Sequence, residues 1–259
     1  MSAASDTHLD RQASSVALPD EVRERIGASL FTVKSHFGGG TGFVVHQGQY
    51  EEGHPFTVVA TAHHVVEDAM TARAEIDFAH GLSGRCYVAN PRHYGIRRAG
   101  HLDIALCMIA DFEFPTAKVP LKAPNDMYLP AGDWAYWMGY PDLVENYAKV
   151  PVPCVFAGIC GAHFDAPLDK PDGSPAINAA GERLSETLYV LDGSVLPGCS
   201  GGPTFTRDGQ VFGVVVAHGA QYDKSGALRT AGVTLAIPLW QAVREALKQP
   251  ASSSDQAGT

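Results

Sequence analysis

The stretch from Leu196 to Pro203 reads Leu-Pro-Gly-Cys-Ser-Gly-Gly-Pro and places Ser200 among glycines. A serine hydroxyl is a weak nucleophile near neutral pH until a histidine takes its proton and a carboxylate orients that histidine. Two upstream segments supply these residue types: residues 60–65 read ATAHHV, and residues 101–106 read HLDIAL. The chain therefore contains a candidate histidine, aspartate and serine, in that order.

Each of these residues has an ordinary interpretation when it is taken alone. Ser200 fits a polar turn, because glycine and serine are common in turns. Asp103 fits a helix cap or a salt bridge, and a histidine beside an apolar run fits a core position. A match to one motif is only a hypothesis. The co-occurrence of all three in this order predicts a catalytic site that contains Asp103, Ser200 and one of the two adjacent histidines.

Residues 198–202 also satisfy the G-x-S-x-G pattern of the α/β-hydrolase nucleophile elbow. That fold places its acid and its histidine after the serine, and it begins a helix directly after the turn. Here the apolar residues 203–205 and 211–216 flank an Asp-Gly turn, which predicts a hairpin. His218 is the one histidine after Ser200. The elbow interpretation is therefore disfavoured.

From about Leu30 to Leu247 the sequence resembles the catalytic domain of the HtrA (Deg) proteases, which are trypsin-like serine proteases of the chymotrypsin fold. The segments that carry the resemblance are Gly40–Val45, Thr61–Val65, Asp103–Leu106, Ala131–Ala135, Gly139–Pro141, Asp192 with Pro197–Pro203, and Gly232–Pro238. The resemblance implies an all-β fold of two six-stranded antiparallel Greek-key barrels with a C-terminal helix.

This fold predicts four parts of the chain: a flexible arm over residues 1–18, a first β-barrel over 19–114, a second over 115–248, and a polar tail over 249–259. The first barrel would carry His64 and Asp103, and the second Ser200 and the C-terminal helix. The tail is too short to be a PDZ domain, so none is expected.

Local patterns predict the elements within these parts. A helix is expected after Pro19, because proline and acidic residues stand in its first turn, and another is expected over 238–247. Residues 164–185, rich in proline, aspartate and glycine, predict a long surface loop. The expected strands are 30–33, 43–45, 56–60, 86–88, 104–109, 134–138, 153–156, 188–191, 211–216 and 233–237.

The resemblance also implies roles for individual residues. It selects His64 as the catalytic histidine because His64 directly precedes an apolar residue, and His63 is then expected to be dispensable. The backbone N–H groups of Gly198 and Ser200 would form the oxyanion hole, since the glycines allow a tight turn.

Residues near Ser200 would form the primary substrate pocket, namely Ser194, Val195, Val216, Ala217 and His218. Their neutral, apolar character favours small or medium aliphatic side chains, because an unpaired buried charge is costly. His218 would instead favour an acidic side chain, so both preferences stay open.

Cys199 departs from the pattern of both groups of relatives. Digestive relatives carry an aspartate directly before the serine, which pairs with a newly cut N-terminus, and HtrA-like relatives often carry asparagine. Zymogen activation through such an ion pair is therefore not expected. Viral proteases of this fold use a cysteine nucleophile, but it stands at the position of Ser200, so Cys199 is expected to be a small buried hydrophobic residue.

Composition is that of an ordinary globular enzyme. The chain has 259 residues, 45% of them hydrophobic, and 19 basic against 28 acidic residues give a net charge of −9. The sequence contains no basic patch of the kind that predicts nucleic-acid binding. It also contains no stretch apolar enough for membrane insertion. The N-terminus has no apolar signal core, so a cytoplasmic location is expected. Five scattered cysteines favour reduced thiols, and no metal or cofactor is expected because the usual motifs are missing.

The sequence therefore predicts a serine endopeptidase that cleaves peptide or protein substrates through an acyl-enzyme intermediate. Two alternatives remain open: a catalytically silent peptide-binding or scaffold protein of the same fold, and an esterase. The oligomeric state is not predicted.

Overall fold

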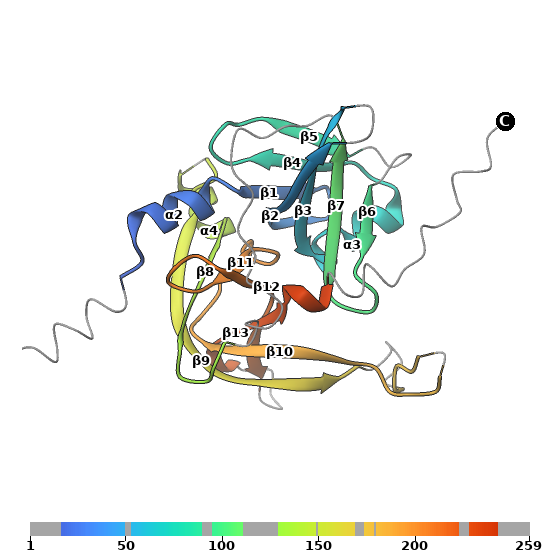
Figure 1. Ribbon diagram of the computed structural model, residues 1–259, viewed down its shortest axis with the longest axis vertical. Helices are drawn as coiled ribbons and strands as arrows, with labels where there is room; N and C mark the ends of the chain where they lie inside the picture. The colour runs from blue at the N-terminus through green and yellow to red at the C-terminus, as the bar shows by residue number, and fades with distance from the viewer. Residues whose placement is uncertain are drawn as a thin grey trace, which may run out of the picture.

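The computed structural model describes residues 17–49, 53–89, 95–110, 129–148, 150–168, 174–178, 180–222 and 228–242. Their strands form two antiparallel sheets, drawn from blue to green and from yellow to red in Figure 1. The overall class therefore agrees with the expected double β-barrel.

The first sheet contains seven strands in the order β5-β4-β1-β2-β3-β7-β6. Its strands are β1 (Leu30–Ser35), β2 (Gly38–Gln49), β3 (Pro55–Ala62), β4 (Ile76–His80), β5 (Cys86–Ala89), β6 (Ile96–Arg98) and β7 (Ile104–Ala110). The sequence predicted a six-stranded barrel here. Within the described residues this sheet has seven strands and is a half-barrel, because the short strands β5 and β6 form its edges and do not pair with each other, and it is consistent with the expected double-barrel fold.

The second sheet is a closed barrel with six strands in the order β10-β13-β12-β11-β8-β9, as expected. Its strands are β8 (Trp134–Gly139), β9 (Cys154–Pro167), β10 (Ser185–Asp192), β11 (Pro203–Phe205), β12 (Val211–Tyr222) and β13 (Leu228–Pro238). Large side chains fill the barrel, with Trp137, Tyr189 and Phe212 each at most 1% exposed. The interior is therefore a packed core.

A shared apolar core joins the two sheets. It includes Phe43 and Ala62 from the first sheet and Met138, Phe205 and Val214 from the second, all nearly fully buried. Burying one large aliphatic or aromatic side chain stabilises a fold by about 1.5–3 kcal/mol. This contact holds the ends of β3 and β7 near the segment that contains Ser200.

Besides residues 239–242, the described part of the chain contains three short helices. The expected N-terminal helix is α2 (Asp20–Gly27), whose Val22 and Ile26 enter the shared core. The sequence did not predict α3 (His63–Ala72) or α4 (Asp142–Ala148). In α3 the residues His63, Val66 and Ala69 face inward at three-residue spacing. Burial of this face stabilises a helix although the adjacent valines have strand propensity.

Other differences follow from pairing between distant segments. β9 continues to Pro167 along β10, so residues 164–167 are strand where a loop was expected. β4 and β6 were not predicted, because each is short and is held by a neighbouring strand. Residues 239–242 are helical where the C-terminal helix was expected. The arm over 1–16, the barrel boundary near residue 114, the rest of that helix and the tail lie outside the described residues.

Among the described helices, none has the length and apolar character needed to span a bilayer.

Candidate active site

His64 and Asp103 form a hydrogen-bonded pair although they come from different elements. His64 lies in the first turn of α3, directly after β3, and Asp103 directly precedes β7, the partner of β3. One Asp103 carboxylate oxygen accepts the His64 backbone N–H at 2.9 Å, and the other lies 2.7 Å from Nδ1 of the ring. An ionised carboxylate only accepts hydrogen bonds. Nδ1 therefore carries the proton, and Nε2 of the neutral ring is available as a base.

The two adjacent histidines have opposite electrostatic environments. The hydrogen bond that the ring donates to the Asp103 carboxylate raises the pKa of His64, and this outweighs the lowering that partial burial causes. Burial lowers the pKa of His63, and the positive charge of Arg98 adds to that effect. The His63 side chain packs inward, with Nδ1 3.7 Å from the Glu67 carboxylate. Of the two histidines, His64 has the carboxylate contact that orients a general base.

Ser200 lies in the connection between β10 and β11, and its backbone packs against the segments that carry His64. The Ser200 carbonyl accepts the Thr41 N–H from β2 at 2.8 Å. A Cβ on Gly201 would lie 2.8 Å from the backbone nitrogen of Ala62, directly before α3. Gly201 also has a φ of +88°, which favours glycine. The fold thus brings the three sequence-predicted segments together where the two sheets meet.

The residues from Leu196 to Cys199 form a type II β-turn. The Cys199 N–H donates to the Leu196 carbonyl at 3.1 Å, and Gly198, the third residue, has a φ of +92°. Type II turns favour proline at the second position and require a positive φ at the third, which matches Pro197 and Gly198. Within the described part of the chain, the N–H groups of Gly198 and Ser200 donate to no protein acceptor. Both are therefore available to an outside oxygen.

The residues predicted to form the substrate pocket have different environments. Ser194 is exposed, whereas Val195 packs into the core of the closed barrel. Val216 lies at a β-bulge between β12 and β13 and enters the shared core of the two sheets. The backbones of Ala217 and His218 belong to β12, but their side chains lie outside the described part of the structure. Of the first three, Ser194 is the one open to solvent.

Cys199 is fully buried within the closed barrel, as expected for a small hydrophobic residue. Burial raises the pKa of its thiol to about 12. Because the thiolate is the nucleophilic form of cysteine, this side chain has little reactivity near neutral pH. Ser200 is the better candidate nucleophile of the two neighbours.

Glu186 on β10 is a charged neighbour of the site that the sequence analysis missed. Its carboxylate accepts a hydrogen bond from the Asp103 backbone N–H. Burial and, to a lesser degree, the negative charge of Asp103 raise the pKa of Glu186, and the positive charge of Arg98 opposes them. The resulting pKa is about 7. The sequence offered no signal, because Glu186 and Asp103 meet only through the contact between the sheets.

The raised pKa of Glu186 predicts a pH-dependent cost to stability. Its folded-state pKa lies above the ordinary value, so the folded state binds the proton more tightly, and stability falls as pH rises from about 4.5 to 7. Glu186→Gln removes this ionisation. Relative to the wild type, the variant is expected to gain about 1 kcal/mol more free energy of unfolding at pH 8 than at pH 5. This value allows for solvent screening of the partly exposed carboxylate.

Denaturant unfolding of both proteins at the two pH values measures this effect. Glu182→Gln is the matched control, because Glu182 is exposed and bonds to the side chain of Asn178. Equal pH dependence in Glu186→Gln and the wild type would contradict the expectation.

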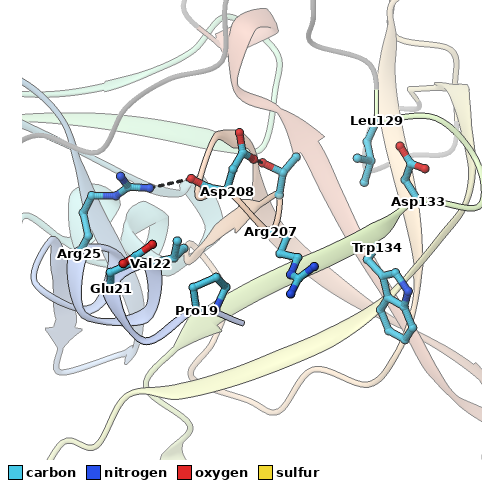
Figure 2. A pocket seen from close by; sticks show the side chains of 10 residues that line it. Pro19, Glu21, Val22, Arg25, Leu129, Asp133, Trp134, Arg207 and Asp208 are labelled. Atoms are coloured by element: carbon cyan, nitrogen blue, oxygen red, sulfur yellow. Dashed lines mark hydrogen bonds between the residues drawn. The ribbon is translucent and has the colours of Figure 1, made fainter. Parts of the chain in front are cut away.

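A cavity of about 930 Å³ lies away from these residues, between α2, the start of β8 and the turn that joins β11 to β12 (Figure 2). Charged groups of both signs line it, including Glu21, Arg25, Asp133 and Arg207. Arg25 donates to the Asp208 carbonyl at 2.8 Å. The described residues that line this cavity include no histidine, serine or cysteine, so it offers no set of side chains for acyl transfer.

Two relatives are probable periplasmic serine endoproteases described as DegP-like. The protein from Pseudomonas fulva (strain 12-X) is 26% identical over 85% of this chain, and the protein from Chlamydia muridarum (strain MoPn / Nigg) is 27% identical over 79%. The matched regions are 36% and 32% of these relatives, so the chain spans about a third of their length.

These relatives overturn one expectation from the sequence. They are periplasmic, as is a third from Chlamydia trachomatis, which contradicts the expected cytoplasmic location. That expectation rested on the lack of an apolar signal core near the N-terminus. A signal core is not part of the folded domain, so the fold carries no information about location.

Solved structures share the fold at low sequence identity. The inactive form of the Rv3671c protease from M. tuberculosis has a TM-score of 0.59 and 20% identity, and the match covers 91% of this chain and 99% of that one. The HtrA-type protease AlgW in complex with a tripeptide has a TM-score of 0.56 and 20% identity, with 87% and 61% covered. These matches support the architecture of two β-barrels.

The family model described as a trypsin-like peptidase domain matches residues 40–214. This range contains the pair His64 and Asp103 as well as Ser200, and it covers more than half of the sequence. The chain belongs to the trypsin-like peptidase family.

Proposed function

We propose that this protein is a serine endopeptidase with Ser200 as nucleophile, His64 as general base and Asp103 as the residue that orients His64. One observation carries the proposal: both Asp103 carboxylate oxygens accept hydrogen bonds from His64, which leaves Nε2 of the ring as a base. Ser200 directly follows the turn of Leu196–Cys199, and within the described residues its N–H and that of Gly198 donate to no protein acceptor. A base together with free backbone donors is the arrangement that acyl transfer requires.

The reaction proceeds in two stages. Ser200 Oγ attacks the carbonyl carbon of the peptide while His64 Nε2 takes its proton, and the N–H groups of Gly198 and Ser200 stabilise the negative oxygen that develops. His64 then gives the proton to the leaving amine, which leaves an acyl-enzyme. Water, activated by the same histidine, repeats the steps and releases the acid. Asp103 stabilises the positive charge on the ring during both stages.

Proteins or peptides outside the cytoplasm are the proposed substrates, since the DegP-like relatives are periplasmic serine endoproteases. Ser194, Val195, Val216, Ala217 and His218 remain the proposed pocket residues. Their neutral, apolar members favour small or medium aliphatic side chains at the cleaved bond, whereas His218 would favour an acidic one.

Covalent labelling tests the function. A fluorophosphonate probe phosphonylates a serine only when a base activates it. We expect the probe to modify the wild-type protein at Ser200, as located by mass spectrometry of the digested adduct. We also expect an unfolded protein substrate such as casein to be cleaved.

Three other outcomes would favour different functions. Absence of labelling in a folded protein would contradict the enzyme and favour a peptide-binding scaffold. Labelling with turnover of esters but not of peptides would favour an esterase. Labelling at a residue other than Ser200 would refute the assignment of the nucleophile.

A further inference from the structure

Thr41 in β2 reaches from the first sheet to the turn that carries Ser200 in the second. Its hydroxyl Oγ1 donates to the Gly198 carbonyl at 2.7 Å and accepts the Tyr140 N–H at 2.9 Å. Its backbone N–H donates to the Ser200 carbonyl at 2.8 Å. Thr41 is fully buried, so water does not compete for these hydrogen bonds. Thr41 therefore links two carbonyls of this segment to the first sheet, one through its side chain and one through its backbone N–H.

Each of the four carbonyls from Pro197 to Ser200 accepts a hydrogen bond, and Thr41 supplies two of them. The donors, in order along the turn, are Asp142 N at 2.9 Å, Thr41 Oγ1 at 2.7 Å, Gly202 N at 3.0 Å and Thr41 N at 2.8 Å. Each of these four peptide planes is thus held by a donor that lies outside the turn or, in the case of Gly202, shortly after it.

Fixed carbonyls determine where the N–H groups point, because in a trans peptide the N–H of one residue points opposite to the C=O of the residue before it, and the described residues contain no cis peptide bond. The N–H groups of Gly198 and Ser200 therefore share planes with the carbonyls of Pro197 and Cys199, which accept from Asp142 N and Gly202 N. Thr41 holds the next plane after each of these, through the Gly198 and Ser200 carbonyls, so the plane of the Ser200 N–H lies between two planes that Thr41 restrains. Gly198 has no Cβ and so has wide conformational freedom of its own. The hydroxyl of Thr41 restrains it by holding its carbonyl, which limits rotation on the C-terminal side of Gly198.

We propose that Thr41 is a positioning residue, which holds the turn so that the N–H groups of Gly198 and Ser200 face the substrate carbonyl. This inference rests on the proposed endopeptidase function. The residue directly before Ser200 is the buried Cys199, which offers no carboxylate for an ion pair. Hydrogen bonds from the uncharged hydroxyl and N–H of Thr41 hold the segment before Gly201 instead. The oxyanion hole therefore depends on contact between the two sheets.

Thr41→Val removes the hydroxyl and keeps the shape of the side chain. Losing an oxyanion donor outright costs about 10²–10³-fold in kcat. A donor that is present but poorly oriented is expected to cost about 10–100-fold, with KM nearly unchanged because the pocket is intact. Thr41→Ser keeps the hydroxyl and is expected to retain kcat within about threefold.

A transition-state analogue separates positioning from a general loss of structure. A peptide boronic acid, built on a sequence that the wild type cleaves, forms a tetrahedral adduct with one oxygen in the oxyanion hole. Its affinity for Thr41→Val is expected to fall by the same factor as kcat/KM. Binding of the uncleaved peptide to an alanine variant of Ser200 is expected to stay the same with and without Thr41→Val.

Thr187→Val is the matched control, because the buried Thr187 hydroxyl also donates one hydrogen bond and accepts one. Its partners are the side chains of Asp165 and Gln241, outside the turn. Thermal unfolding reports whether each variant is folded. If Thr41→Val does not fold, Thr41→Cys takes its place, since a thiol is a weak donor of similar size.

Equal kcat in the wild type, Thr41→Val and Thr187→Val would overturn the role of Thr41. So would a loss in Thr41→Ser as large as that in Thr41→Val. A wild-type protein that no fluorophosphonate labels at Ser200 would instead remove the endopeptidase function itself, which keeps the two failures distinct.

Discussion

Ser200→Ala is expected to lower kcat for peptide cleavage by roughly 10⁶-fold and to abolish labelling by a fluorophosphonate. The reason is that no neighbouring group replaces the hydroxyl. Cys199 is the adjacent candidate, but its side chain is fully buried and burial raises the pKa of its thiol to about 12. Residual turnover would come from the oxyanion hole and substrate binding alone. Peptide turnover and intact-protein mass spectrometry measure the two effects.

A companion variant, Cys199→Ala, separates the two possible nucleophiles. It removes the thiol but leaves the Cys199 carbonyl and N–H of the turn in place, so Ser200 is expected to remain reactive. The lost buried volume is expected to lower stability, which thermal unfolding would report. If Cys199→Ala lost labelling while Ser200→Ala kept it, the assigned roles would have to be exchanged.

His64→Ala is expected to have an effect of the same order, roughly 10⁶-fold on kcat, because members of such a triad act as a unit. Without the ring, nothing accepts the Ser200 proton, and the Asp103 carboxylate loses the contact at 2.7 Å. Ser200 then has the reactivity of an ordinary hydroxyl. Steady-state kinetics of the folded variant measure the loss.

His63→Ala is the matched control, since it removes the same side chain one residue earlier. The backbone N–H of His63, which donates to the Asp103 carbonyl at 3.2 Å, survives the substitution. Its ring faces Glu67 instead of the Asp103 carboxylate. Most of the activity is therefore expected to remain, with some loss of stability from the buried site. An inactive His63→Ala beside an active His64→Ala would show that the wrong histidine was chosen.

Local sequence patterns predicted much of the fold. The alternating and β-branched runs that became β1, β3, β7, β8 and β12 were identified because strand propensity and burial agree there. The glycines on either side of Ser200 predicted a tight turn for steric reasons that operate within a few residues. A histidine, Asp103 and Ser200 were also identified in this order, because residue types are read directly from the sequence.

The errors concern features that depend on distant contacts. The chain after Ala62 carries adjacent valines, yet it forms α3, because one face of this helix packs on the first sheet. The first sheet has seven strands where six were expected, because the short edge strands β5 and β6 are held by pairing with β4 and β7. β9 extends into the expected loop as far as Pro167 because β10 pairs with residues 159–167 of β9.

The amino-acid sequence by itself determined which residues can act as nucleophile, base and acid, and where the backbone can make the turn before Ser200. These properties belong to individual side chains or to a few adjacent residues. The tertiary structure alone decided that His64 contacts the Asp103 carboxylate, that Glu186 adjoins Asp103, and that Thr41 holds the turn. Each of these contacts joins residues from distant parts of the chain. Hydrogen bonds and pKa shifts act over a few ångströms, so they exist only after the two sheets have packed together.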